Sequence, residues 1–177
     1  MGSDTDTGKT AEDPIPESVQ PFWQDGPVRL SDAGSSLILE DSGTSCRLSG
    51  NPREPDLYIR TDHGTEITVY NAFSPGELRR KAQSGEPMRM ATGNVYGIGQ
   101  VCSLILLASR LGRDSMDIGY LEGCRFLELL RERGAVSEET AADLGSEGLK
   151  NPRMMHPFLH SKKVLRTSDG RYYAVQK

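Results

Sequence analysis

The feature that most constrains the fold is an unbroken apolar run at residues 101–108 (VCSLILLA). It is far shorter than the roughly 20 apolar residues that a helix needs to span a bilayer. With its flanking residues it predicts a helix at about 98–111 that is apolar nearly all round, and such a helix has to be buried. We therefore predict a central core helix and no membrane partner.

The stretch from 27 to 71 is typical of short antiparallel strands. Turn-forming sequences such as Asp-Ala-Gly, Asp-Ser-Gly and Gly-Asn-Pro separate its β-prone runs. Tyr58 and Arg60 alternate with Leu57 and Ile59, as in a half-buried strand. The predicted strands are 28–30, 37–39, 46–48, 57–60 and 66–70, and 88–91 is a further candidate.

Helix signals dominate the rest of the chain. Ser74-Pro75 predicts a helix to about 83, with Ser as N-cap and Pro in the first turn. We expect further helices at 120–133, at 137–145 with Ser137 as N-cap, and a short one from Pro157. Asp169-Gly170 between two β-prone runs predicts a hairpin. The predicted fold class is α+β: N-terminal antiparallel strands, a central buried helix, and C-terminal helices plus a β-hairpin wing.

The composition divides the chain into three segments. Residues 1–26 are acidic and interrupted by three prolines, so we expect a disordered tail, although Phe22 and Trp23 can dock where the domain begins. Residues 27–119 should form an α+β domain that is β-rich at its start. Residues 120–177 should form a helix-and-hairpin unit, which alternatively packs with 27–119 as one domain.

Catalytic, cofactor and metal sites are not predicted. The three cysteines are widely spaced and form no CxxC pair, which argues against a disulfide framework or a zinc site. Gly97-x-Gly99 lacks the third glycine of a dinucleotide-binding loop. Pro157 lies between His156 and His160, and no third metal ligand is evident. We expect a non-enzymatic protein and, without a signal peptide, an intracellular location, cytoplasmic or nuclear.

Charge is distributed unevenly along the chain. Residues 150–177 hold seven Lys and Arg against Asp169, a net charge of +6. The remaining residues hold 14 positive and 24 negative side chains, a net charge of −10, and together they give the overall −4. His156 and His160 add positive charge when they are protonated. A basic segment on an acidic body suggests a local anionic partner, and the alternative is a set of ordinary solvated cations.

Residues 126–175 (from FLELLRERGAVSEETAADL to KKVLRTSDGRYYAV) resemble a winged helix. The resemblance implies that the third helix enters a major groove and that the wing contacts phosphate. It places His156, His160, Lys162 and Lys163 on the helix side, and Arg166 and Arg171 on the wing. Pro157 shortens the third helix relative to that family.

Residues 57–119 are similar to the Alba family of chromatin- and RNA-binding proteins. The similarity lies in Tyr58-Ile-Arg-Thr-Asp-His-Gly64, then Met90-Ala-Thr-Gly-Asn-Val95, and the long apolar helix that follows. The basic residue that the family carries after the glycine is absent here, because Asn94 follows Gly93.

Two functional hypotheses emerge. The first is a nucleic-acid-binding protein that contacts DNA or RNA through Arg153, His156, His160, Lys162, Lys163, Arg166 and Arg171. The second is a protein-interaction or assembly module whose winged-helix-like end and acidic tail bind partner proteins.

Overall fold

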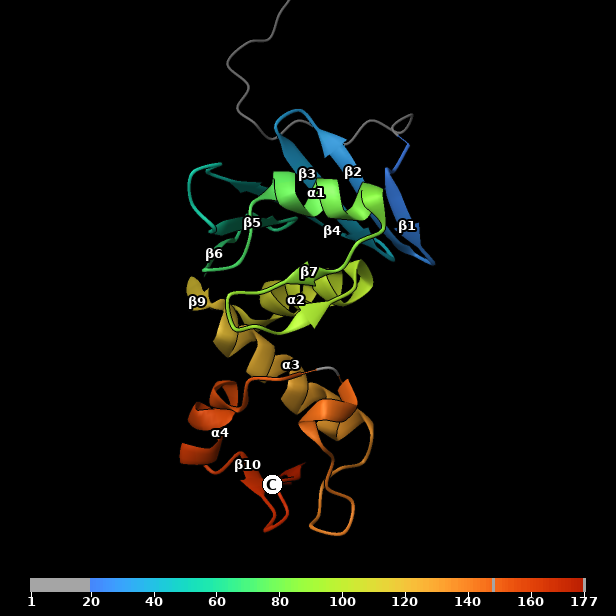
Figure 1. Ribbon diagram of the computed structural model, residues 1–177. Coiled ribbons are helices and arrows are strands. Elements are labelled where there is room, and N and C mark those ends of the chain that lie inside the picture. Colours follow the sequence, from blue (N-terminus) through green and yellow to red (C-terminus); the bar gives the residue numbers. More distant parts are fainter. Residues whose placement is uncertain (1–19, 148, 177) are drawn as a thin grey trace, which may run out of the picture.

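A seven-stranded sheet forms the N-terminal half of the molecule (Figure 1). The computed structural model describes residues 20–147 and 149–176, so most of the predicted acidic tail lies outside the described residues. Strands β1 to β6 form an antiparallel meander, and β9 adds to β6 in parallel. The strands are β1 (Trp23–Asp25), β2 (Val28–Ala33), β3 (Ser36–Asp41), β4 (Thr44–Gly50), β5 (Leu57–Thr61), β6 (Glu66–Tyr70) and β9 (Ser115–Asp117).

One face of this sheet is apolar because the strand register aligns its branched side chains. Leu37 pairs with Leu48, Leu48 with Ile59, and Ile59 with Ile67, so one row crosses β3 to β6. All four side chains are at most 1% exposed. Cross-strand rows of this kind are the stabilising unit of a sheet, and they confirm the alternation expected from the sequence.

The chain crosses from β6 to β9 through two helices and a small hairpin. These elements are α1 (Pro75–Ser84), β7 (Met88–Arg89), β8 (Val95–Tyr96) and α2 (Ile98–Leu111). Helix α1 begins as predicted, since the Ser74 side chain accepts a hydrogen bond from the Glu77 amide. It ends at Gly85, whose φ of 77° is left-handed, a conformation that suits glycine.

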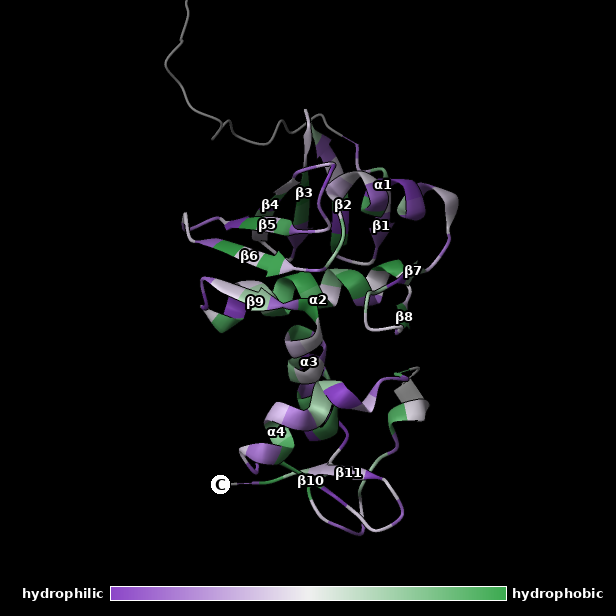
Figure 2. Ribbon diagram, turned by 60° about the vertical axis from the view of Figure 1, so that its left-hand side comes forward, coloured by the Kyte–Doolittle hydropathy of each residue, from purple (hydrophilic) through white to green (hydrophobic). Residues whose placement is uncertain are grey.

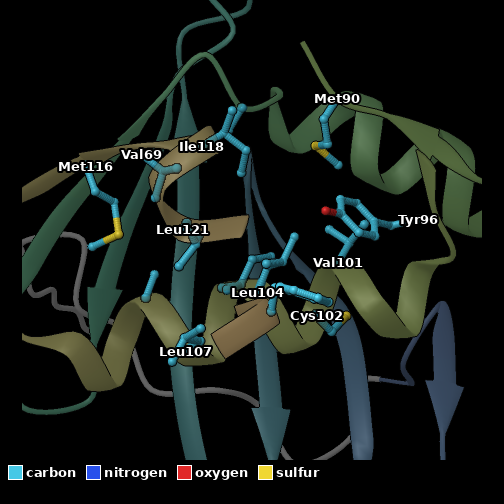
Figure 3. Close-up of a cluster of buried hydrophobic side chains, with 14 of the residues drawn as sticks. Val69, Met90, Tyr96, Val101, Cys102, Leu104, Leu107, Met116, Ile118 and Leu121 are labelled. Atoms are coloured by element: carbon cyan, nitrogen blue, oxygen red, sulfur yellow. The ribbon is translucent and has the colours of Figure 1, made fainter. Parts of the chain in front are cut away.

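Helix α2 is the predicted core element, and its bounds match the expectation. Figure 2 shows it predominantly hydrophobic, and it packs against β5 and β6. In Figure 3, side chains from several elements meet around it, among them Val69 of β6, Tyr96 of β8 and Leu121 of the following helix. Cys102 is buried and carries a free thiol.

Helix α3 (Ile118–Glu132) follows β9 directly and leads away from the sheet to the C-terminal elements (Figure 1). These are η1 (Leu144–Glu147), η2 (Pro152–Met155), α4 (His156–His160), β10 (Val164–Arg166) and β11 (Tyr172–Ala174). Both β10–β11 pairing across Asp169-Gly170 and the short helix near Pro157 agree with the sequence prediction. Phe126 of α3 meets Tyr172 of β11 edge to face, 5.9 Å between ring centroids.

The predicted helix at 137–145 is wrong. Residues 137–140 form a turn in which the Thr140 hydroxyl accepts from the Val136 and Ser137 amides. Ala142 then pairs with Tyr172 of β11 in both directions, at 2.8 and 2.7 Å. An extended backbone that pairs with a strand cannot also be helical, so a distant partner overrides the local capping signal.

Two other boundaries also differ from the prediction. The expected disorder to residue 26 is wrong for Trp23–Asp25, which pairs with Val28–Leu30 as β1 around a turn at Gly26. No element was predicted between the core helix and the helix at 120–133. There Ser115–Asp117 pairs with β6 in parallel, because the preceding crossover returns the chain to the sheet edge.

A single hydrophobic cluster runs through the described residues, from Leu30 in β2 to Ala174 in β11. No helix within residues 20–147 and 149–176 has both the length and the apolar character of a membrane span.

Candidate functional site

Exposed basic side chains are concentrated on the C-terminal elements. Helix η2 continues into α4 without a break, and Arg153, His156 and His160 are spaced three and four residues apart along it. The opposite side buries Met154, Met155 and Phe158. Helical periodicity therefore brings the three polar side chains to the same side. Together with the following turn and strand they form what we term the basic stripe: Arg153, His156, His160, Lys162, Lys163 and Arg166.

Every member of the basic stripe is exposed. None of the six forms an ion pair with an acidic residue in the described part of the chain, although many other arginines do. Lys162 adopts a left-handed backbone with φ of 62°. The chain turns here from α4 into β10, so Lys162 and Lys163 lie in the turn between these two elements. An unneutralised cluster of this kind attracts anions over about a Debye length, roughly 8–10 Å at moderate salt.

Arg171 differs from the other predicted contact residues. Its Nε lies 3.1 and 3.0 Å from the two carboxylate oxygens of Asp169, and its Nη1 donates to the Ala141 carbonyl at 3.2 Å. Both its charge and its donors are therefore used to hold the β10–β11 turn against the segment after α3. Arg166 keeps its exposure, with its guanidinium 5.7 Å from the centroid of the Tyr172 ring.

A shallow groove of about 350 Å³ adjoins the basic stripe between α3 and η2–α4. Tyr120, Arg153 and Pro157 contribute to its walls. The Tyr120 ring stacks on Phe158 at 5.6 Å, and the Arg113 guanidinium lies 4.7 Å from its centroid. Arg113 thus extends the positive surface toward α3. The count of charged residues in the sequence did not indicate Arg113, because this residue lies outside the basic segment 150–177.

A buried polar cluster lies behind these elements and joins three parts of the chain. Glu122 of α3 is 1% exposed, and its carboxylate accepts from the Thr92 hydroxyl at 2.6 and 2.7 Å. The Asn94 amide nitrogen donates to the same carboxylate at 3.1 and 3.2 Å. The Asn94 oxygen accepts from the amides of Lys150 and Asn151 at 2.5 and 3.2 Å. The cluster therefore positions the segment that enters η2 and the basic stripe.

Burial raises the pKa of Glu122, and the hydrogen bonds from Thr92, Asn94 and Tyr96 only partly oppose this effect. The same burial, with the nearby Glu122 carboxylate, raises the pKa of Tyr96. Our sequence interpretation overlooked this cluster. The signal that was available is a glutamate four residues from both Ile118 and Phe126, on the apolar side of a helix.

The loop at residues 92–94 is part of this cluster. Asn94, which follows Gly93, is fully buried and uses its side chain on Glu122 and on the 150–151 backbone. The polar groups of this side chain are thus directed into the molecule. Within the described residues there is no group of three or more side chains that could hold a metal ion.

Comparison of the chain with known protein families, curated proteins and solved structures found no match.

Proposed function

We propose that the protein binds nucleic acid through the basic stripe, without catalysing a reaction on it. The observation that carries the proposal is the exposure of six cationic or ionisable side chains with no acidic partner in the described part of an otherwise acidic chain. Phosphate is the anion that such a surface recognises most generally, because counterion release supplies affinity without any base contact.

The order of elements supports the same reading. Helix α3, the single bridge at Ala142, the short helices and the β10–β11 hairpin follow each other as in a winged helix. The equivalent of the recognition helix is α4, which has five residues. So short a helix offers few base contacts, and we expect most of the affinity to come from phosphates, with weak sequence preference.

Fluorescence anisotropy with labelled single- and double-stranded oligonucleotides tests the proposal. We expect affinity to fall steeply between about 50 and 200 mM salt. Replacing Arg153 and Lys163 by Gln should lower the slope of log affinity against log salt by about 1.8 on duplex DNA, or about 0.9 for each lost phosphate contact. Deleting residues 150–177 is not a clean test, because it removes the buried Phe158, Val164 and Tyr172.

The matched control replaces Arg89 and Arg131 by Gln. Both side chains are exposed and lie outside the basic stripe, so the net charge changes equally while the slope should stay unchanged. If the two double variants gave the same slope of log affinity against log salt, binding would depend only on the net charge of the protein. That result would contradict a binding site at the basic stripe. Absence of binding at low salt would favour the assembly hypothesis, for which Leu165 of β10, 38% exposed, is the apolar contact to test next.

A further inference from the structure

A cavity of about 430 Å³ lies between β1, α2 and α3, and none of the basic-stripe residues lines it. Its volume falls in the range of roughly 300–1,000 Å³ that small-molecule sites occupy. Trp23 and Asp25 approach it from β1, Tyr96 from β8, and Glu122, Arg125 and Phe126 from α3. Ligand sites of this size are typically lined by apolar and aromatic side chains with a small number of placed polar groups.

Three aromatic side chains form part of its wall. Phe126 is buried, and its orientation is held by the edge-to-face contact with Tyr172. Tyr96 is 5% exposed. Trp23 is half-buried, and the tip of its ring approaches α2 where Gly99 has no side chain: a Cβ there would lie 4.0 Å from the ring and 3.7 Å from an Asp25 carboxylate oxygen. Aromatic faces beside carboxylates attract cations through the ring quadrupole.

The charged side chains that line the cavity carry a net negative charge when ionised. Among the residues that the structure describes, Arg125 is the only cation in its lining, and it is already paired with Glu128 at 2.5 Å and Glu132 at 3.4 Å. Asp25 lies at the exposed side of the cavity, and Glu122 lies buried in its wall. Glu122 receives hydrogen bonds from neutral donors and forms no ion pair within the described residues. A buried carboxylate with only neutral partners is stabilised by a cation brought close to it.

We propose that this cavity binds a small organic cation, an alkylated ammonium group, between Trp23 and Tyr96 with Asp25 and Glu122 as counter-charges. The aromatic rings select the cation by its charge and its apolar methyl surface, and the carboxylates exclude anions. None of the residues that line the cavity belongs to the basic stripe, which carries the opposite charge.

Trp23 is the single tryptophan of the chain, so intrinsic fluorescence reports on this cavity directly. Choline is the probe, and 3,3-dimethylbutan-1-ol is its neutral isostere. We expect a saturable change in Trp23 emission with choline, and binding of the isostere that is about thirtyfold weaker, the factor that a desolvated cation–π contact supplies.

The Asp25→Asn variant keeps the shape of the side chain and removes its charge, and it should weaken choline binding about fivefold, as for one exposed ion pair. Asp114→Asn, an exposed acid in the turn before β9, is the matched control and should leave choline affinity unchanged. Equal affinity for choline and its isostere, equal effects of the two variants, or no saturable signal with choline at millimolar concentration would each overturn the proposal. None of these outcomes bears on oligonucleotide binding.

Discussion

At the scale of single residues, Glu122 is the group whose chemistry depends most on the fold. A carboxyl group that is 1% exposed can keep a charge only if donors replace water around it. Thr92, Asn94 and Tyr96 supply those donors from the β7–β8 region, while the nearby negative charge of Asp117 adds to the rise in the Glu122 pKa. The Glu122 carboxylate therefore has hydrogen-bond partners, but its ionisation still costs electrostatic free energy.

This balance predicts a pH dependence. The folded-state pKa of Glu122 lies above its usual 4.5, so the folded protein holds a proton that the unfolded chain releases. The stabilisation is fully present below about pH 4.5 and is lost as pH rises through the folded-state pKa. We expect the free energy of unfolding of the wild type, relative to Glu122→Gln, to decrease over this window, by at most about 1.4 kcal/mol per pH unit for one proton.

Urea denaturation of both proteins at a series of pH values measures this difference. Titrating groups that do not interact with Glu122 are common to the two proteins and cancel in the comparison. Tyr96 does interact with Glu122, but its pKa is raised above its usual 10, so it does not titrate at acidic or neutral pH. A difference that stays flat with pH, or that grows as pH rises, would contradict a raised pKa for Glu122.

At the scale of elements, the contact of α3 with η2–α4 sets the position of the basic stripe. Gly123 lies at this crossing, where an added Cβ would come within 2.5 Å of Phe158 Cε2 and 2.7 Å of the Met154 carbonyl oxygen. One of these atoms belongs to backbone and the other to a buried ring, so neither can move aside without disturbing the core. Glycine here permits the close approach of the two helical segments.

We therefore expect Gly123→Ala to destabilise the protein by about 1–3 kcal/mol through overpacking. In an open helix position the same change usually stabilises by about 0.5–1 kcal/mol. Gly76→Ala in α1 is the control, because the nearest atom to its added Cβ is Ser74 Oγ at 4.0 Å. Chemical denaturation followed by circular dichroism compares the two, and a Gly123→Ala variant as stable as Gly76→Ala would exclude the close-packing explanation.

At the scale of the whole molecule, α3 joins the sheet to the C-terminal elements. Ile118 and Leu121 near its beginning are part of the same buried cluster as the sheet, and Phe126 further along meets Tyr172 of β11. The Asn94–Glu122 hydrogen bonds reinforce this connection from the side. No break in apolar packing therefore separates residues 27–119 from 120–176 within the described part of the chain.

A shared core of this kind predicts one cooperative unfolding transition. Native-state hydrogen exchange should give the amides of Leu39 in β3 and Tyr172 in β11 the same free energy of opening, because both need global unfolding to exchange. A Tyr172 amide that opens at distinctly lower free energy would show that the C-terminal elements unfold as a separate unit.

Local sequence signals account for most of the elements. The apolar periodicity of α2, the Ser74-Pro75 start of α1 and the Asp169-Gly170 turn act over a few residues, and each led to an element at the expected place. The basic segment was likewise evident from residue types alone. For these features, neighbours in the sequence are also neighbours in space.

The remaining features depend on partners far apart in the chain. Ala142 is extended because Tyr172 pairs with it, 30 residues away, and Glu122 is buried against donors 28 and 30 residues before it. The exposure of the basic stripe and the cavity beside Trp23 have the same origin. The sequence by itself therefore determined the fold class and the uneven charge, whereas tertiary packing decided which charges are buried and which face solvent, because desolvation is a property of the surroundings and not of the residue.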